Sequence, residues 1–413
     1  MLSTTKYWVW LSSAAEPAAA WLVYDHFGSP EDAFLADESS YDLIRGLPAS
    51  QRASLRAKDL SLAEEILDNC VRHNIRVLTW QDAGYPERLR NTYQPPMVLY
   101  LKGRTCHFDE EAAIAMAGTR KATLYGKQMA FSIAQEITLM GGLVVTGIVT
   151  GCDYHSAVGA LTAGGPLVCV TAGGVDVPYY DSRSGRRFLE DIAAAGTLIS
   201  LNPPGTHHLG SYFARRNQLL VGLTLGVVCV EAAARSGTLQ VARMAADQSR
   251  DVFTVPANVG IPSSAGTNHL LRQGAIPILH GSHVLEEYEH LFPFKGLRQA
   301  EEQGAGNRRP PAVSPAPAVR RDVPPERTKK KIDTAGSPDY IDLDAQRSQF
   351  SDDELVLLQA LRQGPLSAEE LIEQSKLPAS RAVAAVTLLV LRGFAVELPG
   401  NRFQLSDQPG PQS

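Results

Sequence analysis

The sequence predicts an α/β protein with an extended Rossmann-like, doubly wound and mainly parallel sheet, a small helical unit before it and a winged helix after it. Short apolar runs alternate with helical patterns between residues 112 and 279, as βα units require. Helical spacing without strand patterns fills residues 1–72. Residues 346–406 carry three helical patterns and a hairpin. At 413 residues, the chain is long enough for two or three domains.

We expect residues 1–72 to form a small helical domain of the SAM-like type. Ser29 should cap a helix that begins at Pro30, because serine caps and proline at the first position both favour helix starts. The last helix, 61–72, should place four apolar side chains on one face: Leu62, Ile66, Leu67 and Cys70. Such a module either binds DNA backbone or protein, or serves only as a scaffold.

Residues 73–294 should form the sheet domain. Continuous apolar strands of four to six residues are typical of a sheet that is covered on both faces. The expected strands are 112–117, 143–146, 167–171, 197–201, 227–230, 252–255 and 276–279. In such sheets ligands bind beyond the carboxyl ends of the strands. We therefore expect the functional residues to follow those ends.

Residues 295–345 are rich in proline, lysine and arginine and should form a flexible linker. This linker is either a solvated tether or a segment that makes weak, salt-sensitive contact with nucleic acid.

Residues 346–406 should form the winged helix, followed by a tail at 407–413. Capping boxes are expected at Ser351 with Glu354 and at Ser367 with Glu370. The third helix, about 380–391, offers few basic or amide side chains, whereas duplex-reading helices usually carry them. This favours a partner-binding or packing role over base readout.

Composition indicates an ordinary soluble protein, with 44% hydrophobic and 20% charged residues. The formal net charge of −5 means that any nucleic-acid site must be a local basic patch. The five cysteines are widely spaced and fit free thiols in a reducing compartment. We see no signal peptide and no apolar run of membrane length, so we expect a cytoplasmic protein without membrane insertion.

The stretch after the first parallel strand is the centre of the functional prediction. Gly118, Thr119, Arg120 and Lys121 lie between that strand and a helical pattern at 125–140. A strand-to-helix turn leaves backbone N–H groups free for anions, and the two cations suit phosphate. We expect the phosphates bound there to belong to a polynucleotide.

Known nucleotide motifs do not fit this turn. A P-loop requires Gly-Lys-Ser/Thr at a fixed distance, but Gly126-Lys127 lies too far from Gly118 and Gln128 replaces the hydroxyl. The glycine set of a dinucleotide fold is missing as well. No cofactor, metal site or catalytic residue is therefore predicted.

A second basic stretch combines Arg215, Arg216 and Asn217 with Tyr212 and Phe213. Guanidinium groups beside aromatic rings suit single strands, because they offer charge to the backbone and a ring face to an unstacked base. Alternatively, Phe213 is core and the arginines are a solvated helix face. Further charge comes from arginines upstream: Arg183, Arg186 and Arg187.

A third stretch follows Glu231, which is either a catalytic carboxylate or a residue that orients a loop. Ser236, Gly237 and Thr238 should lie at a helix N-terminus, which again favours anions.

Taken together, these stretches resemble the DNA processing protein A family (DprA, also called Smf), over nearly the whole chain. The landmarks, in order, are Gly118-Thr119-Arg120, Tyr125-Gly126, Thr146-Gly147, Gly151, Asp153, Gly159-Ala160-Leu161, Gly174, Asp176, Pro203-Pro204-Gly205, Phe213, Arg216-Asn217, Glu231-Ala232, Ser236-Gly237-Thr238-Leu239, Arg250-Asp251-Val252-Phe253, Val255-Pro256, Gly266-Thr267-Asn268 and Gly274-Ala275.

The resemblance implies a homodimeric protein that binds single-stranded DNA and is not an enzyme. It further implies protection of incoming strands in natural transformation and loading of the RecA recombinase. The residues that it carries over as strand contacts are Arg120, Phe213, Arg216 and Asn217, with the loops at Gly147 and at 236–238.

The sequence departs from the family pattern at several positions. Thr150 and Gln218 stand where a cation is common, and Ala214, Ala157 and Leu201 also differ from the usual residues. The loss of two cations, at roughly 1 kcal/mol or less each, could lower DNA affinity about tenfold or more.

Two other functions stay open. Nucleotide phosphoribohydrolases of the same superfamily need a glutamate after the Gly-Thr turn, but Gly237-Thr238-Leu239 is followed by Gln240 and Val241. A transcription regulator acting through the winged helix would bind duplex DNA through residues 346–413.

Overall fold

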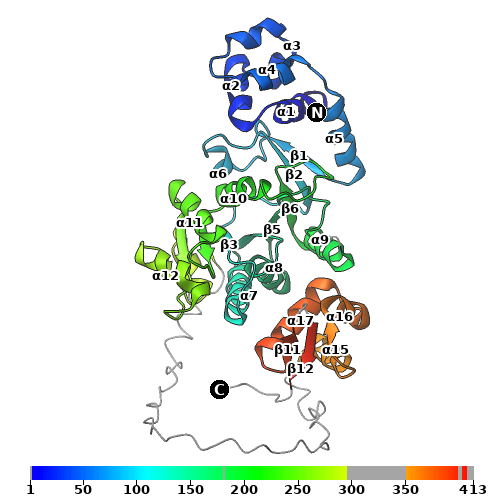
Figure 1. Cartoon of the computed structure of the whole chain (residues 1–413), viewed down its shortest axis with the longest axis vertical. Coiled ribbons are helices and arrows are strands. Elements are labelled where there is room, and N and C mark those ends of the chain that lie inside the picture. Colours follow the sequence, from blue (N-terminus) through cyan, green and yellow to red (C-terminus); the bar gives the residue numbers. More distant parts are fainter. Residues whose placement is uncertain (1, 180–181, 295–349, 399–401, 407–413) are drawn as a thin grey trace, which may run out of the picture.

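The computed structural model describes residues 2–179, 182–294, 350–398 and 402–406. Figure 1 shows a helical unit at one end, a central sheet with helices on both faces, and a second small unit beside helices α7–α9. The expected linker at 295–345 and the tail at 407–413 lie outside the described residues. No helix within the described ranges is long and apolar enough to cross a bilayer.

Helices dominate the chain before the sheet, as predicted. Ser29 caps its helix by accepting a hydrogen bond from Asp32 N, and Pro30 is the first helical residue. Trp21 packs edge-on against Trp80, which joins this unit to the start of the sheet. The helices are α1 (Leu2–Ala14), α2 (Pro17–Phe27), α3 (Pro30–Leu35), the 3₁₀ helix η1 (Glu38–Leu43), α4 (Ala49–Arg56) and α5 (Ser61–Arg72).

The central sheet has nine strands in the order β1-β2-β6-β5-β4-β3-β7-β8-β9. In this order, the seven neighbouring strands β6, β5, β4, β3, β7, β8 and β9 are parallel, as predicted. Strands β1 and β2 add an antiparallel edge beside β6. The strands are β1 (Arg76–Thr79), β2 (Val98–Gly103), β3 (Ala113–Ala117), β4 (Leu143–Gly147), β5 (Leu167–Val170), β6 (Thr197–Ser200), β7 (Gly226–Cys229), β8 (Asp251–Thr254) and β9 (Ile276–Pro277).

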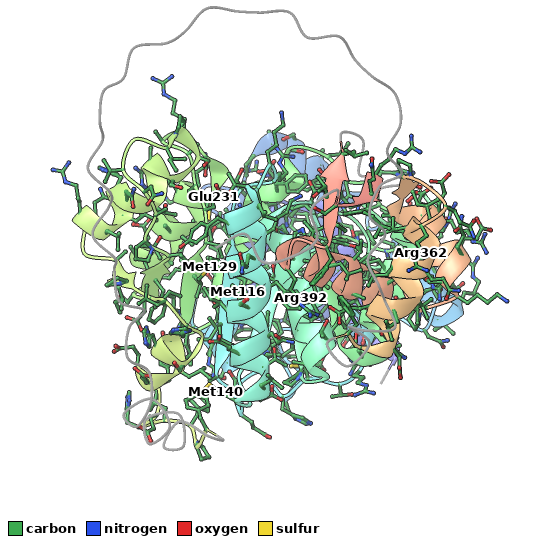
Figure 2. The ribbon with its side chains drawn as sticks, turned by 90° about the horizontal axis from the view of Figure 1, so that it is seen from below. Met116, Met129, Met140, Glu231, Arg362 and Arg392 are labelled. Carbon is green, nitrogen blue, oxygen red and sulfur yellow. The ribbon has the colours of Figure 1, made fainter. Side chains whose placement is uncertain are left out.

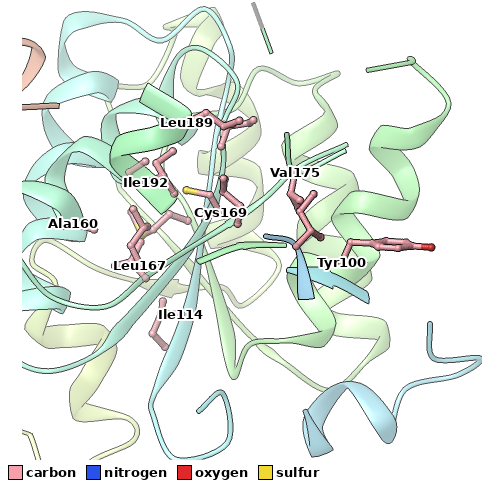
Figure 3. Close-up of a cluster of buried hydrophobic side chains, with 14 of the residues drawn as sticks. Tyr100, Ile114, Ala160, Leu167, Cys169, Val175, Leu189 and Ile192 are labelled. Atoms are coloured by element: carbon pink, nitrogen blue, oxygen red, sulfur yellow. The ribbon is translucent and has the colours of Figure 1, made fainter. Parts of the chain in front are cut away.

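Alternate residues of each central strand enter different cores, which explains the continuous apolar runs. In β3, Ile114 and Met116 join the core on one face, whereas Ala113 and Ala115 join the core on the other. Figure 3 shows Ile114, Leu167 and Cys169 of the first core near side chains from α8 and α9. The covering helices are α6 (Glu87–Arg90), α7 (Leu124–Leu139), α8 (Cys152–Ala163), α9 (Arg183–Ala195), α10 (Tyr212–Gly222), α11 (Gly237–Asp247), α12 (Ala265–Arg272) and α13 (Ser282–Glu286).

The chain reverses its direction of winding between β3 and β7. From β3 it proceeds through β4, β5 and β6 on one side, and then returns to place β7 on the other side of β3. Loops that leave two neighbouring strands in opposite directions open a crevice, which is where doubly wound sheets bind ligands. This switch point places the loops after β3 and β7 side by side.

The last unit is a winged helix, as predicted. Both expected capping boxes are present, because Ser351 and Glu354, and Ser367 and Glu370, hydrogen-bond reciprocally at their helix starts. Its elements are α15 (Asp352–Leu361), β10 (Leu366–Ser367), α16 (Ala368–Ser375), α17 (Ala379–Leu391), β11 (Ala395–Leu398) and β12 (Arg402–Leu405).

Candidate functional site

Glu231 fastens the two loops of the switch point to each other. Its backbone carbonyl accepts a hydrogen bond from Thr119 N at 2.9 Å, and its Oε2 accepts one from Thr123 N at 2.9 Å. Thr123 in turn caps α7 by accepting from Gly126 N. Figure 2 shows Glu231 near one end of α7 and Met140 at the other. The buried carboxylate of Glu231 is therefore a positioning group for the loop after β3.

Arg120 and Lys121 are the exposed cations of that loop. Arg120 Nη1 lies 3.5 Å from Tyr179 Oη and makes no ion pair with any described residue. Because neither cation pairs with a carboxylate of the residues that the structure describes, both remain available to an anion from solvent.

Gly118 lets the loop sit close to the start of α8. A Cβ at this position would overlap the side chain of Cys152. The backbone carbonyl of Thr119 accepts a hydrogen bond from Cys152 N at 3.1 Å, so the loop and the N-terminus of α8 are held together. The geometry thus brings Gly118 and Thr119 to the site as its backbone frame.

Arg216 does not reach the surface, which argues against the direct strand contact expected of it. Its Nη2 donates to Asp153 Oδ2 at 2.7 Å, and its Nε donates to Val170 O at 3.1 Å. Its Nη1 donates to Asn217 Oδ1, so the side-chain oxygen of Asn217 also has an internal partner. Burial raises the pKa of Asp153, and the Arg216 guanidinium opposes that rise. Arg216 and Asn217 are therefore internal links between α10, α8 and β5.

Gly147 serves this internal pair. A Cβ on Gly147 would overlap both the Arg216 guanidinium and the Asp153 carboxylate. Gly147 is buried, so the end of β4 requires a glycine for packing, and the predicted contact of Gly147 with DNA stays a prediction.

The remaining residues of α10 point to two different places. Phe213 is half-buried, with its ring centroid 6.2 Å from that of Tyr179, whose hydroxyl lies 3.5 Å from Arg120 Nη1. Arg215 is exposed but lines a separate cavity of about 410 Å³, which it shares with the helical unit, including Ser12 and Asn69. The structure therefore brings Phe213 toward Arg120, but not Arg215.

The third stretch forms the N-terminus of α11, as predicted. Ser236 Oγ accepts a hydrogen bond from Thr238 N at 3.1 Å, so it is a helix cap. Thr238 is buried, whereas Gly237 is exposed with open space where a side chain would be. Only the backbone at Ser236 and Gly237 is open to a ligand.

A cavity of about 840 Å³ lies beside the loop after β3. Arg120, Lys121 and Thr150 line it from the loops, and Lys127 lines it from α7. Lys127 was not predicted as a site residue, because its only sequence signal was a failed P-loop pattern. Thr150 is exposed, and it provides a hydroxyl and no charge to the cavity.

His155 is a second unpredicted member of this cavity. Its Nδ1 is buried and has no hydrogen-bond partner among the described residues. Burial, followed by the nearby charge of Lys127, lowers the pKa of His155 to about 3. The imidazole is neutral at physiological pH and adds no charge to the site.

Arg183, at the start of α9, is exposed but already has a partner. Its Nη1 lies 3.3 Å from Glu373 Oε1 of the winged helix. The next residue, Ser184, donates from Oγ to Glu369 Oε1 at 3.1 Å. The cation that we expected to meet a strand therefore meets a carboxylate of the same chain.

The fold and the site define a class: a doubly wound α/β protein with a winged helix and two exposed cations at its switch point. Comparison with known families narrows that class. The family model for DNA recombination-mediator protein A matches residues 76–289, and the DprA winged helix domain matches residues 342–401. The chain belongs to this family, the DprA/Smf proteins.

Individual relatives agree with the assignment. The chain is 32% identical over 307 residues to the putative DNA processing protein DprA of Mycobacterium tuberculosis, covering 71% of this chain and 77% of that protein. It is 34% identical over 203 residues to DNA processing protein DprA of Bacillus subtilis, covering 49% and 68%.

A solved structure, that of DNA processing protein A from Streptococcus pneumoniae, shares the fold. The TM-score is 0.60 at 24% identity, over 67% of this chain and 95% of that one.

Proposed function

We propose that this protein binds single-stranded DNA across the switch point of its sheet, between the loops after β3 and β7. The observation that carries this proposal is the pair of exposed cations at that crevice, Arg120 and Lys121, which form no ion pair within the described part of the chain. Lys127 adds a third charge in the adjoining cavity, where it is paired with Glu397 of the winged helix. The proposed contacts are Arg120, Lys121, Lys127, Phe213 and the backbone at 118–119 and 236–237.

Aromatic side chains next to the cations favour an unpaired strand over a duplex. Tyr179 lies beside Arg120, and Phe213 lies beside Tyr179. Rings at this place can stack on unstacked bases, which a duplex does not present. The net charge of −5 over the whole chain supports a local site of this kind rather than general attraction to duplex DNA.

We propose binding rather than catalysis as the activity. Glu231, the carboxylate at the crevice, is buried and accepts a hydrogen bond from the Thr123 backbone. This arrangement supports a positioning role, and Val241 stands where the related hydrolases need a glutamate.

The relatives named DNA processing protein suggest the biological setting. We propose that the protein protects incoming single strands in the cytoplasm during natural transformation and transfers them to the RecA recombinase. A homodimer would place two such crevices along one strand. Two sites on one strand would raise avidity well above that of either site.

Direct binding measurements test the proposal. Fluorescence anisotropy would compare an oligonucleotide of about 30 nucleotides as a single strand and as a duplex, at about 50 and about 200 mM salt. We expect tighter binding of the single strand. Three phosphate contacts predict a loss of roughly twentyfold in affinity over that salt range. Equal affinity for both forms would reject the proposal.

A further inference from the structure

The third helix of the winged helix has two apolar faces with different partners. Ala385, Val386 and Leu389 belong to the winged helix's own core. Ala382 and Val383, on another face, are buried in the core that includes α8 and α9 of the sheet unit. Figure 1 shows α17 lying beside α8. The winged helix is therefore docked on the sheet unit through side chains that its own fold does not need.

Acidic side chains of the winged helix surround this apolar contact. Glu397, on β11, is paired with Lys127, and Glu373, on α16, is paired with Arg183. Glu369 accepts a hydrogen bond from Ser184. Each partner on the sheet unit is a cation or a hydroxyl at or next to the proposed strand site. Carboxylates thus occupy positions that suit phosphate oxygens.

The two kinds of contact make different contributions. Arg183 and Glu373 are both highly exposed, so their pair adds little to the free energy of docking. Burial of Val383 and Ala382, which are 7% and 1% exposed, provides the attraction. The acidic residues pair with two cations and a hydroxyl of the sheet unit, at positions where a phosphate would compete with them.

The docked helix is not presented to duplex DNA. The third helix of a duplex-reading winged helix enters the major groove. Here α17 packs on protein, and its Arg381 is paired with Asp353 at 2.6 Å. Arg392, just after α17, donates to Glu354. This favours protein binding over a role in transcription.

We propose that the winged helix is a protein-binding module whose partner is the α8–α9 face of its own chain, and that it competes with single-stranded DNA for Lys127 and Arg183. The inference rests on the proposed strand site. A bound strand displaces Glu397 and Glu373 and thereby releases the winged helix. Arg120 remains exposed while the winged helix is docked, so a strand can begin to bind before displacement.

Full-chain variants test the competition. Val383→Asp places a charge in the docking contact, and Val356→Asp, at an exposed valine of α15, is the matched control. We expect Val383→Asp to tighten single-strand binding about tenfold. This factor follows if the docked form of the wild type outnumbers the released form by about ten to one, because the variant removes the docked form. The control should bind like the wild type. Equal affinity of all three proteins, or weaker binding by Val383→Asp, overturns the competition and leaves the strand site itself intact.

A second variant guards against loss of folding. Glu373→Gln with Glu397→Gln removes the charges without disturbing the apolar core, and it should also tighten binding severalfold. Glu286→Gln, exposed on α13, controls for the general effect of removing negative charge. If the wild type and every variant fail to bind a single strand, both the proposed function and this inference fall.

Hydrogen exchange measures the displacement of the winged helix from the sheet unit directly. Saturating single-stranded DNA should raise amide exchange in α9 and α17 of the wild type. Unchanged protection in both helices with DNA bound would overturn the inference. A contact between two copies of the chain would weaken when the protein is diluted. Loss of protection in α9 and α17 on dilution without DNA would therefore show that the winged helix docks on a second copy, and would overturn the intramolecular contact.

Discussion

Asp153 accepts a hydrogen bond from Arg216 at 2.7 Å, and both side chains are buried beside Gly147. The pair connects the first turn of α8 to α10 under the crevice in which we place the DNA strand. A buried arginine with three internal partners supports the crevice from inside the protein and is not exposed to a phosphate.

This relationship predicts that Arg216→Ala acts on stability. Removing the guanidinium leaves an uncompensated buried carboxylate, which should cost about 3–5 kcal/mol in free energy of unfolding. Urea titration with a thermal melt would measure the loss. Arg215→Ala, one residue away and exposed, should stay within about 0.5 kcal/mol of the wild type. Unchanged stability of Arg216→Ala with loss of DNA binding would return Arg216 to the contact surface.

Glu231 offers a second test, because a positioning carboxylate and a catalytic one respond differently. Glu231→Ala leaves Thr123 N without its acceptor and should cost about 1–3 kcal/mol. Glu231→Gln keeps an acceptor oxygen and should lose less stability. Incubation with nucleoside monophosphates should release no base from any of the three proteins. Base release by the wild type that Glu231→Gln abolishes would instead support the hydrolase.

The neutral state of His155 predicts a dependence of stability on pH. Its folded pKa of about 3 is below the ordinary value, so the unfolded chain binds a proton that the folded chain does not. Stability from this group is fully present above about pH 6.5 and falls as the pH drops toward about 3.

A matched variant isolates the effect of His155. Between about pH 6.5 and about pH 5.5, the wild type should lose roughly 1 kcal/mol more than His155→Gln, measured by urea titration. Comparison with the variant cancels His208, whose pKa burial also lowers. Parallel pH profiles for the two proteins would show that the imidazole titrates normally.

The local features of this fold could be predicted from sequence, because their partners lie within a few residues. The capping boxes at Ser351 and Ser367 need only a glutamate three residues later. The burial of Arg216 could not be predicted, because its partner lies 63 residues earlier and the space for it depends on Gly147.

The docking of the winged helix could not be predicted from the sequence for the same reason. Lys127 and Glu397 are 270 residues apart, and neither carries a local signal of the pairing. Only the weak basic character of the third helix indicated that the winged helix would bind protein.

The central claim is that Arg120 presents charge to a DNA strand at the switch point. The most direct test is single-strand binding by Arg120→Ala across a salt titration, with Arg45→Ala, exposed in the helical unit, as the matched control. We predict weaker binding at every sequence and a salt slope reduced by about 0.7, the value for one lost phosphate contact, while the control is unchanged. Wild-type affinity and slope in Arg120→Ala would contradict the account.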